Sequence, residues 1–384
     1  MTEQAPTAAT PVPATMRAAV LVDDEPRLRV EEVPVPTPRA DEALVRIRSC
    51  GVCHTDLHVI KSEVAFPRPA VLGHEISGTI VAIGEGTEQA GDLAVGSDVV
   101  GAFIMPCTRC DACRRGRDDM CDAFFAQNRL RGTLYDGESR LTRADGSFLA
   151  MYSMGGLADY AVVPLSALTA LPADLEPVSA AVLGCAAFTA YGAVHRAAQL
   201  TADQSVAVVA AGGVGSGLLQ LARAAGADPV IAIDVVDEKL EAARRLGATH
   251  TVNSADRDAA EAVREITGGR GVDVAFEALG RPATFRQALG LLADGGRMVA
   301  VGIAPGAEVG EVEITPLVRR GYSVVGSFGA RTRADLPAVV QAAAAGDFDA
   351  VGLVTRRYDL DDVDDAYQAL ARGEITGRAV VTTS

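Results

Sequence analysis

The sequence places several reactive side chains within eight residues, GVCHTDLH at residues 51–58. Cysteine thiolates and imidazoles are common protein ligands of zinc, and threonine, aspartate and histidine can hold or move protons. Cys53 is therefore a candidate metal ligand. Two further candidates stand far from it in the chain, His74 in GHE and Cys185 in LGC. Three such ligands would leave a fourth position open on the ion, but sequence spacing alone does not join Cys185 to the others.

A second group of cysteines follows the closely spaced pattern C-x2-C-x2-C-x7-C. One loop with this spacing can wrap a tetrahedral ion with four thiolates and no open position, which indicates a structural zinc. Four unbonded core cysteines are the alternative, and the polar residues between them argue against it. The chain has seven cysteines, and this odd number with regular spacing favours metal binding over disulfides. The four positions are Cys107, Cys110, Cys113 and Cys121.

A glycine-rich stretch, VAVVAAGGVGSG at residues 206–217, combines a predicted strand with the start of a predicted helix. Backbone N–H groups and the helix dipole at such a turn attract a pyrophosphate. Asp234 ends the next predicted strand, 19 residues after Gly215, where a carboxylate accepts hydrogen bonds from the ribose of NAD and repels a 2′-phosphate. Ala210 replaces the first glycine of the usual fingerprint. The alternative is a surface turn that binds nothing.

The segments around these residues show two patterns. From about residue 16 to 164, short β-rich runs such as RAAVLV and GTIVAIG are separated by Gly, Pro and Asp, which predicts a β-rich domain. From about residue 206 strands and helices alternate, and the strands are apolar without a polar face. That pattern is typical of a doubly wound parallel sheet with helices on both faces. The tail from about residue 328 returns to acidic helices and ends in the strand-like AVVTT.

Length and composition limit the classes of protein to consider. With 384 residues, 49% hydrophobic and 22% charged, the chain is expected to form two globular domains. The net charge is −15 and the only lysines are Lys61 and Lys239, so nucleic acids and anionic membranes are not expected as partners. Residues 1–15 lack the basic start and apolar middle of a signal peptide, and we expect a flexible tail there. We expect a soluble, cytoplasmic protein.

Taken together and in order, the motifs resemble a known family. They are GVCHTDLH, GHE, the four-cysteine lobe, RGTLYDGESRL, LGCAAFTAYGAV, GGVG and Asp234. From about Met16 onward the chain resembles the zinc-containing alcohol dehydrogenases of the medium-chain dehydrogenase/reductase superfamily. The resemblance implies an α/β fold with a GroES-like β-rich catalytic domain at 16–186 and 328–384. It also implies a Rossmann NAD-binding domain at 187–327.

The resemblance implies a role for each matching residue. A catalytic zinc would be bound by Cys53, His74 and Cys185, and a structural zinc by the four-cysteine lobe, giving two zinc ions per chain. Thr55 and His58 match a proton relay, with helix capping as the alternative. Asp56 matches the carboxylate that orients His74, and Glu75 matches an acidic neighbour of the metal. The residues implied to contact NAD are His54, Thr189, Gly212, Gly213, Val214, Gly215, Asp234, Lys239, Val301 and Arg378.

The implied reaction is a reversible hydride transfer between a primary alcohol and NAD, in which zinc acts as a Lewis acid. Phe103, Met151 and Tyr152 would line an apolar pocket for an aromatic or longer-chain alcohol. Three alternatives remain: a nicotinoprotein that retains NAD, a thiol-adduct formaldehyde dehydrogenase, and a non-catalytic NAD-binding protein. Val64 replaces the acid expected for the thiol-adduct enzyme. By analogy we expect a homodimer or homotetramer that associates through an edge strand near RMVAVGIAP, residues 297–305. His195, His250 and Cys50 receive no role.

Overall fold

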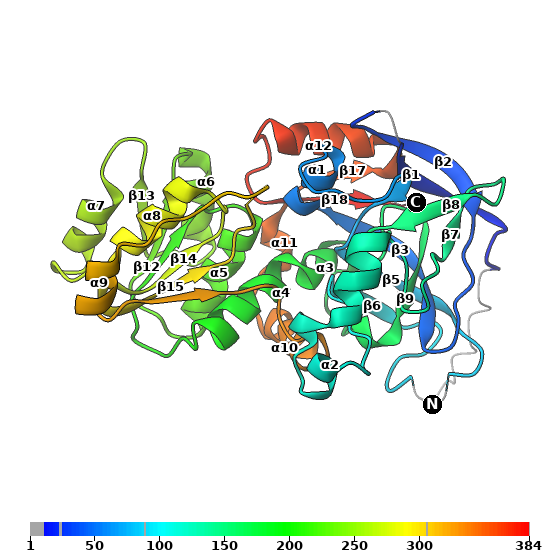
Figure 1. Cartoon of the computed structure of the whole chain (residues 1–384), viewed down its shortest axis with the longest axis horizontal. Helices are drawn as coiled ribbons and strands as arrows, with labels where there is room; N and C mark the ends of the chain where they lie inside the picture. The colour runs from blue at the N-terminus through cyan, green and yellow to red at the C-terminus, as the bar shows by residue number, and fades with distance from the viewer. Residues whose placement is uncertain (1–10, 23–24, 88–89, 305, 384) are drawn as a thin grey trace.

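The computed structural model describes residues 11–22, 25–87, 90–304 and 306–383. Most of the expected flexible tail at 1–15 lies outside these residues, and strand β1 already begins at Thr15. Figure 1 shows two lobes side by side, a β-rich lobe that contains the first and last strands, β1 and β18, and a lobe built on one parallel sheet. The expected combination of a GroES-like β-rich domain and a Rossmann-type domain is confirmed.

The β-rich lobe contains a five-stranded sheet in the order β2-β1-β4-β8-β7 and a seven-stranded sheet in the order β10-β6-β5-β3-β18-β17, with β9 also paired to β3. The last strand, β18, is inserted beside β3, with Ala379 opposite Val52. The C-terminus therefore completes the sheet that leads directly into Cys53. The strands are β1 (Thr15–Leu21), β2 (Leu28–Pro34), β3 (Glu42–Val52), β4 (Ala70–Val71), β5 (Ile76–Ile83), β6 (Asp98–Gly101), β7 (Leu141–Thr142), β8 (Phe148–Met151), β9 (Tyr160–Pro164), β10 (Leu168–Ala170), β17 (Val354–Asp359) and β18 (Arg378–Thr382).

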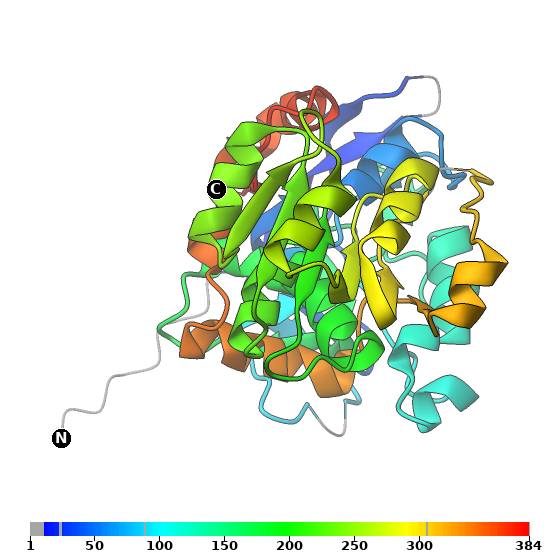
Figure 2. The ribbon, with the colours of Figure 1, turned by 90° about the vertical axis from the view of Figure 1, so that its left-hand side faces the viewer.

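The second lobe is a six-stranded parallel sheet in the order β13-β12-β11-β14-β15-β16. Figure 2 shows helices on both of its faces. This arrangement explains the uninterrupted apolar runs, since β11 and β12 are buried along their whole length. The strands are β11 (Val206–Val209), β12 (Val230–Asp234), β13 (His250–Asn253), β14 (Val272–Glu277), β15 (Leu292–Ala300) and β16 (Ser323–Gly326).

Helices connect the strands and join the two lobes. The glycine-rich turn leads into α5, and α4 packs against α5. Two hydrophobic clusters fill the interior: the larger runs through both lobes, and the smaller lies on one face of the parallel sheet. The helices are α1 (His54–Ile60), α2 (Asp111–Arg114), α3 (Pro177–Ala180), α4 (Ala186–Tyr191), α5 (Gly213–Ala224), α6 (Asp237–Arg245), α7 (Ala259–Ile266), α8 (Pro282–Gly290), α9 (Ile314–Arg319), α10 (Thr332–Ala345), α11 (Ala350–Leu353) and α12 (Val363–Ala371).

The expected edge strand near residues 297–305 is wrong. Its first four residues, 297–300, form the end of β15, which pairs with β14 on one side and with β16 on the other. The outer strand at this end of the sheet is β16, because α9 returns the chain for one more parallel strand. The free edge, and any association through it, therefore belongs to Ser323–Gly326.

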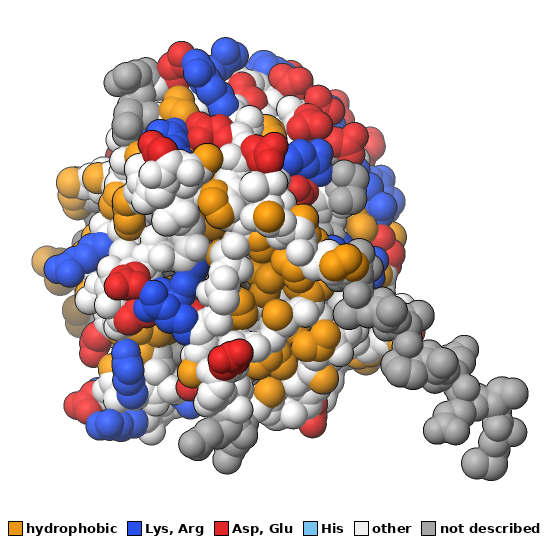
Figure 3. Space-filling model, turned by 90° about the vertical axis from the view of Figure 1, so that its right-hand side faces the viewer, with side chains coloured by type: hydrophobic (Ala, Val, Ile, Leu, Met, Phe, Trp, Pro, Cys, Tyr) orange, Lys and Arg blue, Asp and Glu red, His pale blue; other side chains and the backbone are white. Residues whose placement is uncertain are grey.

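Two further observations concern the expected absence of nucleic acid and membrane partners. Figure 3 shows acidic and basic side chains mixed along the top and left of the face that it displays, and hydrophobic side chains gathered over its centre. Within the described ranges, no single helix is both long and apolar enough to cross a membrane. A bent pair, Pro177–Gly184 with Ala186–Ala197, meets the criteria of length and composition, and most of its residues are buried in the protein.

Candidate active site

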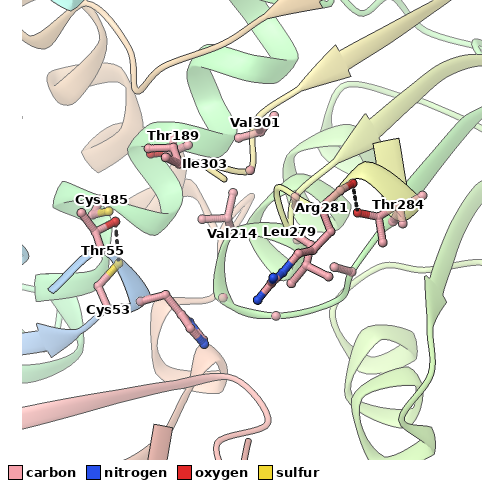
Figure 4. A pocket seen from close by; sticks show the side chains of 18 of the residues that line it. Cys53, Thr55, Cys185, Thr189, Val214, Leu279, Arg281, Thr284, Val301 and Ile303 are labelled. Carbon is pink, nitrogen blue, oxygen red and sulfur yellow. Dashed lines mark hydrogen bonds between the residues drawn. The ribbon is translucent and has the colours of Figure 1, made fainter. Parts of the chain in front are cut away.

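The structure brings Cys185 to the other two candidate zinc ligands. Cys53 lies between β3 and α1, His74 lies between β4 and β5, and Cys185 precedes α4. Their donor atoms and a carboxylate oxygen of Glu75 all lie within 4.8 Å of one another, and all four residues are buried. Figure 4 shows Cys53, Thr55 and Cys185 together at one side of the pocket. The donor set of two thiols and one imidazole fits the catalytic zinc that the sequence predicts.

His74 is held in the orientation that a metal ligand needs. Its Nδ1 lies 3.1 Å from Asp56 Oδ1, and both residues are fully buried. Its Nε2 is buried without a hydrogen-bond partner. The Asp56 carboxylate accepts a hydrogen bond from Nδ1, so a metal ion would bind at Nε2, which faces the thiols, and would displace any proton held there. Burial lowers the pKa of His74, but the charges of Asp56 and Cys53 outweigh it and raise the pKa to about 10.

The Asp56 carboxylate is itself fixed by two donors. The backbone N–H of Gly73 donates to Oδ1 at 3.3 Å, and the phenol of Tyr367 donates to Oδ2 at 3.0 Å. Tyr367 lies on α12, 311 residues further along the chain. Tyr367 was not predicted as a site residue, because nothing in the local sequence around it indicates contact with a residue so distant along the chain.

Arg378 lies between the candidate zinc ligands and the glycine-rich turn. Its Nη2 lies 3.0 Å from Glu75 Oε1, and its Nη1 donates to the Val52 carbonyl at 3.3 Å. Its Nε has no partner, and a Cβ added at Gly213 would lie only 2.5 Å from that nitrogen. Burial raises the pKa of Glu75 to about 7, although the charge of Arg378 opposes the shift. Gly213 therefore leaves room for a guanidinium at the position where a pyrophosphate is expected.

The turn itself has unusual backbone geometry. Ala210, at the first glycine position of the fingerprint, has a φ of +76°, in the left-handed region that disfavours a Cβ. Its carbonyl oxygen would lie 1.9 Å from a Cβ at Gly215, so the glycine there is required. Asp234 also has a bracing role that the sequence analysis missed. Its Oδ2 accepts from Ala211 N–H at 2.8 Å, and its Oδ1 accepts from Val235 N–H at 2.8 Å.

The residues proposed for proton transfer lie on α1 and line the same cavity as the metal ligands. Thr55 Oγ1 is 3.7 Å from Cys53 Sγ, and His58 Nδ1 forms a short contact with Glu63. Both lie inside the helix, and the N-cap position of α1 is occupied by Cys53. His54 is open to the cavity, and desolvation by its walls lowers the pKa of the imidazole.

The cavity has a volume of about 490 Å³ and extends from the metal cluster to the glycine-rich turn. Figure 4 shows Arg281 and Thr284 across the pocket from Cys53, and Val214 lies between the two sides. Arg281 was not predicted from the sequence, because residues that line a cavity from loops show no periodic pattern. The expected cofactor residues Thr189, Val214, Lys239 and Val301 are among those that line this cavity.

The expected substrate residues are only partly placed in this cavity. Phe103 lines it, whereas Met151 and Tyr152 do not. Met151 is buried in β8 opposite Val71, and Tyr152 packs behind His74 with 6.3 Å between the ring centroids. The side chain that reaches the cavity on this side is Arg129, which lies over the Tyr152 ring. The pocket therefore has a cation where the sequence analysis expected an aromatic residue.

The four cysteines of the second cluster also fit a metal ion. Their sulfur atoms lie within 4.8 Å of one another. Backbone N–H groups point at the sulfurs, from Cys110 to Cys107 Sγ at 3.4 Å and from Cys113 to Cys110 Sγ at 3.5 Å. Such bonds stabilise thiolates, and four thiolates are a closed tetrahedral donor set for zinc. Arg333 of α10 holds this lobe by donating to the Cys113 carbonyl at 2.6 Å.

Comparison with known proteins agrees with this geometry. The model of the alcohol dehydrogenase GroES-like domain matches residues 39–173, and that of the zinc-binding dehydrogenases matches residues 213–345. An S-(hydroxymethyl)glutathione dehydrogenase of Synechocystis sp. is 32% identical over 93% of this chain and 97% of its own length. The benzyl alcohol dehydrogenase of Acinetobacter calcoaceticus is 30% identical, with a TM-score of 0.89 over 96% of this chain and 99% of that one. An acetophenone reductase of Geotrichum candidum, solved with NAD, is 26% identical, with a TM-score of 0.78 over 97% and 98% of the two chains.

These matches extend over nearly the whole described chain and include both lobes. The chain therefore belongs to the zinc-containing alcohol dehydrogenases of the medium-chain dehydrogenase/reductase superfamily, and it is an enzyme of the oxidoreductase class.

Proposed function

We propose that this protein catalyses reversible hydride transfer between a primary alcohol and NAD, giving an aldehyde and NADH. One observation carries the proposal: a single cavity joins the buried metal cluster at Cys53 to the dinucleotide-type turn at Gly213. A hydride donor and a nicotinamide must meet within contact distance, and this cavity provides the space for both. Aromatic and longer-chain alcohols are the proposed substrates, since Phe103 and Phe328 line the cavity.

We propose two zinc ions per chain. Cys53, His74 and Cys185 would hold the catalytic ion, because the lone pair of His74 Nε2 is buried without a partner beside two thiols. The four-cysteine lobe would hold the structural ion. Bound zinc at the catalytic site supplies Lewis acidity that makes an alcohol hydroxyl easier to deprotonate.

The chain's own residues would handle the proton. Thr55 Oγ1 lies 3.7 Å from Cys53 Sγ, and its hydroxyl could relay a proton by accepting one from the substrate alcohol while passing its own proton onward. His58 lies one helical turn further along α1, and its imidazole can pass the proton outward. Glu63 contacts His58 Nδ1 and holds the imidazole in place.

NAD is the proposed cofactor, and Asp234 supports the choice over NADP. Asp234 lines the cavity at the end of β12 and holds its carboxylate in place with backbone N–H donors. A 2′-phosphate at the ribose would meet this negative charge. Arg378 and Lys239 would attract the pyrophosphate and the ribose side of the dinucleotide, as the sequence analysis expected.

The experiment follows NADH absorbance when purified protein is mixed with NAD and alcohols from ethanol to benzyl and long-chain alcohols. Cys53→Ser should lose activity and catalytic zinc while keeping the fold. Cys50→Ser is the matched control, because Cys50 is also a buried thiol of the same segment but is outside the donor set. Absence of turnover in zinc-loaded protein with every alcohol would refute the proposal.

Two related functions can be tested with the same purified protein. A thiol-adduct formaldehyde dehydrogenase is favoured by the relative from Synechocystis, and it predicts turnover of formaldehyde only when glutathione is added. A nicotinoprotein predicts that NAD remains bound through gel filtration and that an artificial acceptor is required. Either result would show that the main activity is not the oxidation of alcohols by freely exchanging NAD.

We propose that the chain associates as a homodimer or homotetramer through the free edge of β16. Val324 on this strand is 39% exposed, and Ile314 and Val318 on the preceding α9 are 76% and 72% exposed. Apolar side chains beside an unpaired strand edge favour pairing with a second copy. Sedimentation of the wild type and of Val324→Lys tests this, and a monomeric wild type would contradict it.

A further inference from the structure

The cavity is positively charged in a protein that is otherwise strongly acidic. The chain carries a net charge of −15. Among the described residues that line the cavity, the only carboxylate is Asp234, whereas the cationic side chains are Arg129, Lys239, Arg281 and Arg378. Three of these four are accounted for: Arg378 pairs with Glu75, and Lys239 and Arg281 lie on the dinucleotide-binding lobe. Arg129 belongs to the β-rich lobe and lies at the metal end of the cavity.

Arg129 has no counter-ion among the described residues. In the described part of the chain, its guanidinium forms no ion pair and no hydrogen bond of normal geometry, and its Nη1 is buried without a partner. A guanidinium carries five N–H donors, and leaving them unsatisfied in a partly buried site is costly. Most other arginines of the lobe are paired, as Arg140 is with Glu42 at 2.6 Å. An unpaired arginine in a substrate cavity indicates that a ligand supplies the acceptor.

The position of Arg129 is fixed by Tyr152. The guanidinium carbon lies 4.0 Å from the centroid of the Tyr152 ring, a stacked cation–π arrangement. The centroid of the Tyr152 ring in turn lies 6.3 Å from that of the His74 ring, so Tyr152 lies between the guanidinium and a candidate zinc ligand. Stacking on one face holds the guanidinium flat and leaves its edge for in-plane hydrogen bonds. That geometry suits a bidentate carboxylate.

We infer that Arg129 binds a carboxylate at the far end of the substrate, so that the preferred substrates are hydroxy acids or aldehyde acids rather than neutral alcohols. The inference rests on the proposed alcohol dehydrogenase function and narrows its substrate class. The alcohol end would lie at the metal cluster, and a short spacer packed against Phe103 would carry the carboxylate to Arg129. Arg129 is then a specificity-determining residue.

The test compares kcat/KM for matched pairs of substrates that differ in the charged group. One set pairs 3- and 4-(hydroxymethyl)benzoate with 3- and 4-methylbenzyl alcohol. A second set pairs ω-hydroxy acids, from butyric to octanoic length, with the corresponding alkanols. The proteins are wild type, Arg129→Met, Arg129→Lys and the matched control Arg131→Met, since Arg131 is an exposed arginine two residues away that does not line the cavity.

We expect wild type to prefer the carboxylate in at least one pair by about tenfold to a hundredfold, the range for hydrogen bonds to charged groups. Arg129→Met should abolish this preference, Arg129→Lys should keep part of it because the charge remains, and Arg131→Met should keep all of it. A second readout is the thermal shift by the carboxylate in the presence of NADH, which Arg129→Met should remove.

The possible failures are distinguishable. Turnover of neutral alcohols by wild type without preference for any carboxylate would overturn this inference and leave the proposed function intact. A carboxylate preference that survives in Arg129→Met would also overturn it, since another residue would then be responsible. Absence of turnover with every substrate would refute the proposed function, and with it this inference.

Discussion

The phenol of Tyr367 donates a 3.0 Å hydrogen bond to Asp56, and both residues are buried. Asp56 holds His74 by its other oxygen, so Tyr367 acts on a zinc ligand through one intermediate. Partners of this kind orient a metal ligand and raise its basicity. The C-terminal helix α12 thus participates in building a site whose ligands all precede it by well over a hundred residues.

Removing this hydroxyl should weaken zinc binding. Tyr367→Phe leaves one oxygen of a buried carboxylate without its donor, and we expect zinc affinity to fall about tenfold to a hundredfold. Competition with a chelator measures the affinity of the catalytic site. Tyr191→Phe is the control, because the Tyr191 ring packs on His195 away from the ligands. Equal zinc affinity in wild type and Tyr367→Phe would show that Asp56 is held well enough without the phenol.

The glycine-rich turn should respond in opposite ways to two small substitutions. Ala210→Gly removes the Cβ from a left-handed residue and should raise the free energy of unfolding by about 0.5–1 kcal/mol. Gly215→Ala places a Cβ 1.9 Å from the Ala210 carbonyl, so it should destabilise the turn and weaken NAD binding at least about tenfold. Urea unfolding and NADH titration give the two quantities. If Ala210→Gly lowered stability, the left-handed conformation would not be the source of strain.

NAD affinity should depend on pH through His54. A protonated imidazole would attract the pyrophosphate, and that attraction is lost as pH rises through the pKa. Desolvation lowers this pKa, so the loss should occur below the ordinary histidine value of about 6.5. His54→Arg stays charged, and it should bind NAD more tightly than wild type at pH 7 to 8 with a flat profile between pH 5 and 8. The idea fails if the two profiles have the same shape.

The stability of the four-cysteine lobe and its retention of zinc should depend on a contact with α10. Arg333 donates to the Cys113 carbonyl and forms an ion pair with the buried Asp118 at 2.7 Å. Arg333→Met leaves that carboxylate unpaired, and we expect a loss of about 1–3 kcal/mol in the free energy of unfolding together with faster release of zinc from this lobe. Arg115→Met, an exposed arginine of the same lobe, is the control. Identical zinc-release rates in the two variants would exclude a role for the contacts of Arg333 with Cys113 and Asp118.

Several features of this protein are determined by local sequence. The strand at Val206–Val209 is where its apolar run predicts, because a strand buried on both faces has no polar positions. The four cysteines also lie close together because of their local spacing, since C-x2-C-x2-C lets one loop surround an ion. The same holds for the turn before α5, where the glycines lie between a strand and a helix start.

Other features were decided only by the tertiary structure. Cys185 joins Cys53, and Tyr367 reaches Asp56, because sheets and helices from distant segments pack together. Insertion of β18 beside β3 places Arg378 between the metal cluster and the turn. The same packing placed Arg129 in the cavity and Tyr152 behind it, and it made β16 the outer strand at one end of the parallel sheet. Local spacing determines contacts within one loop or strand, whereas contacts between segments depend on which surfaces are buried against each other when the whole chain folds.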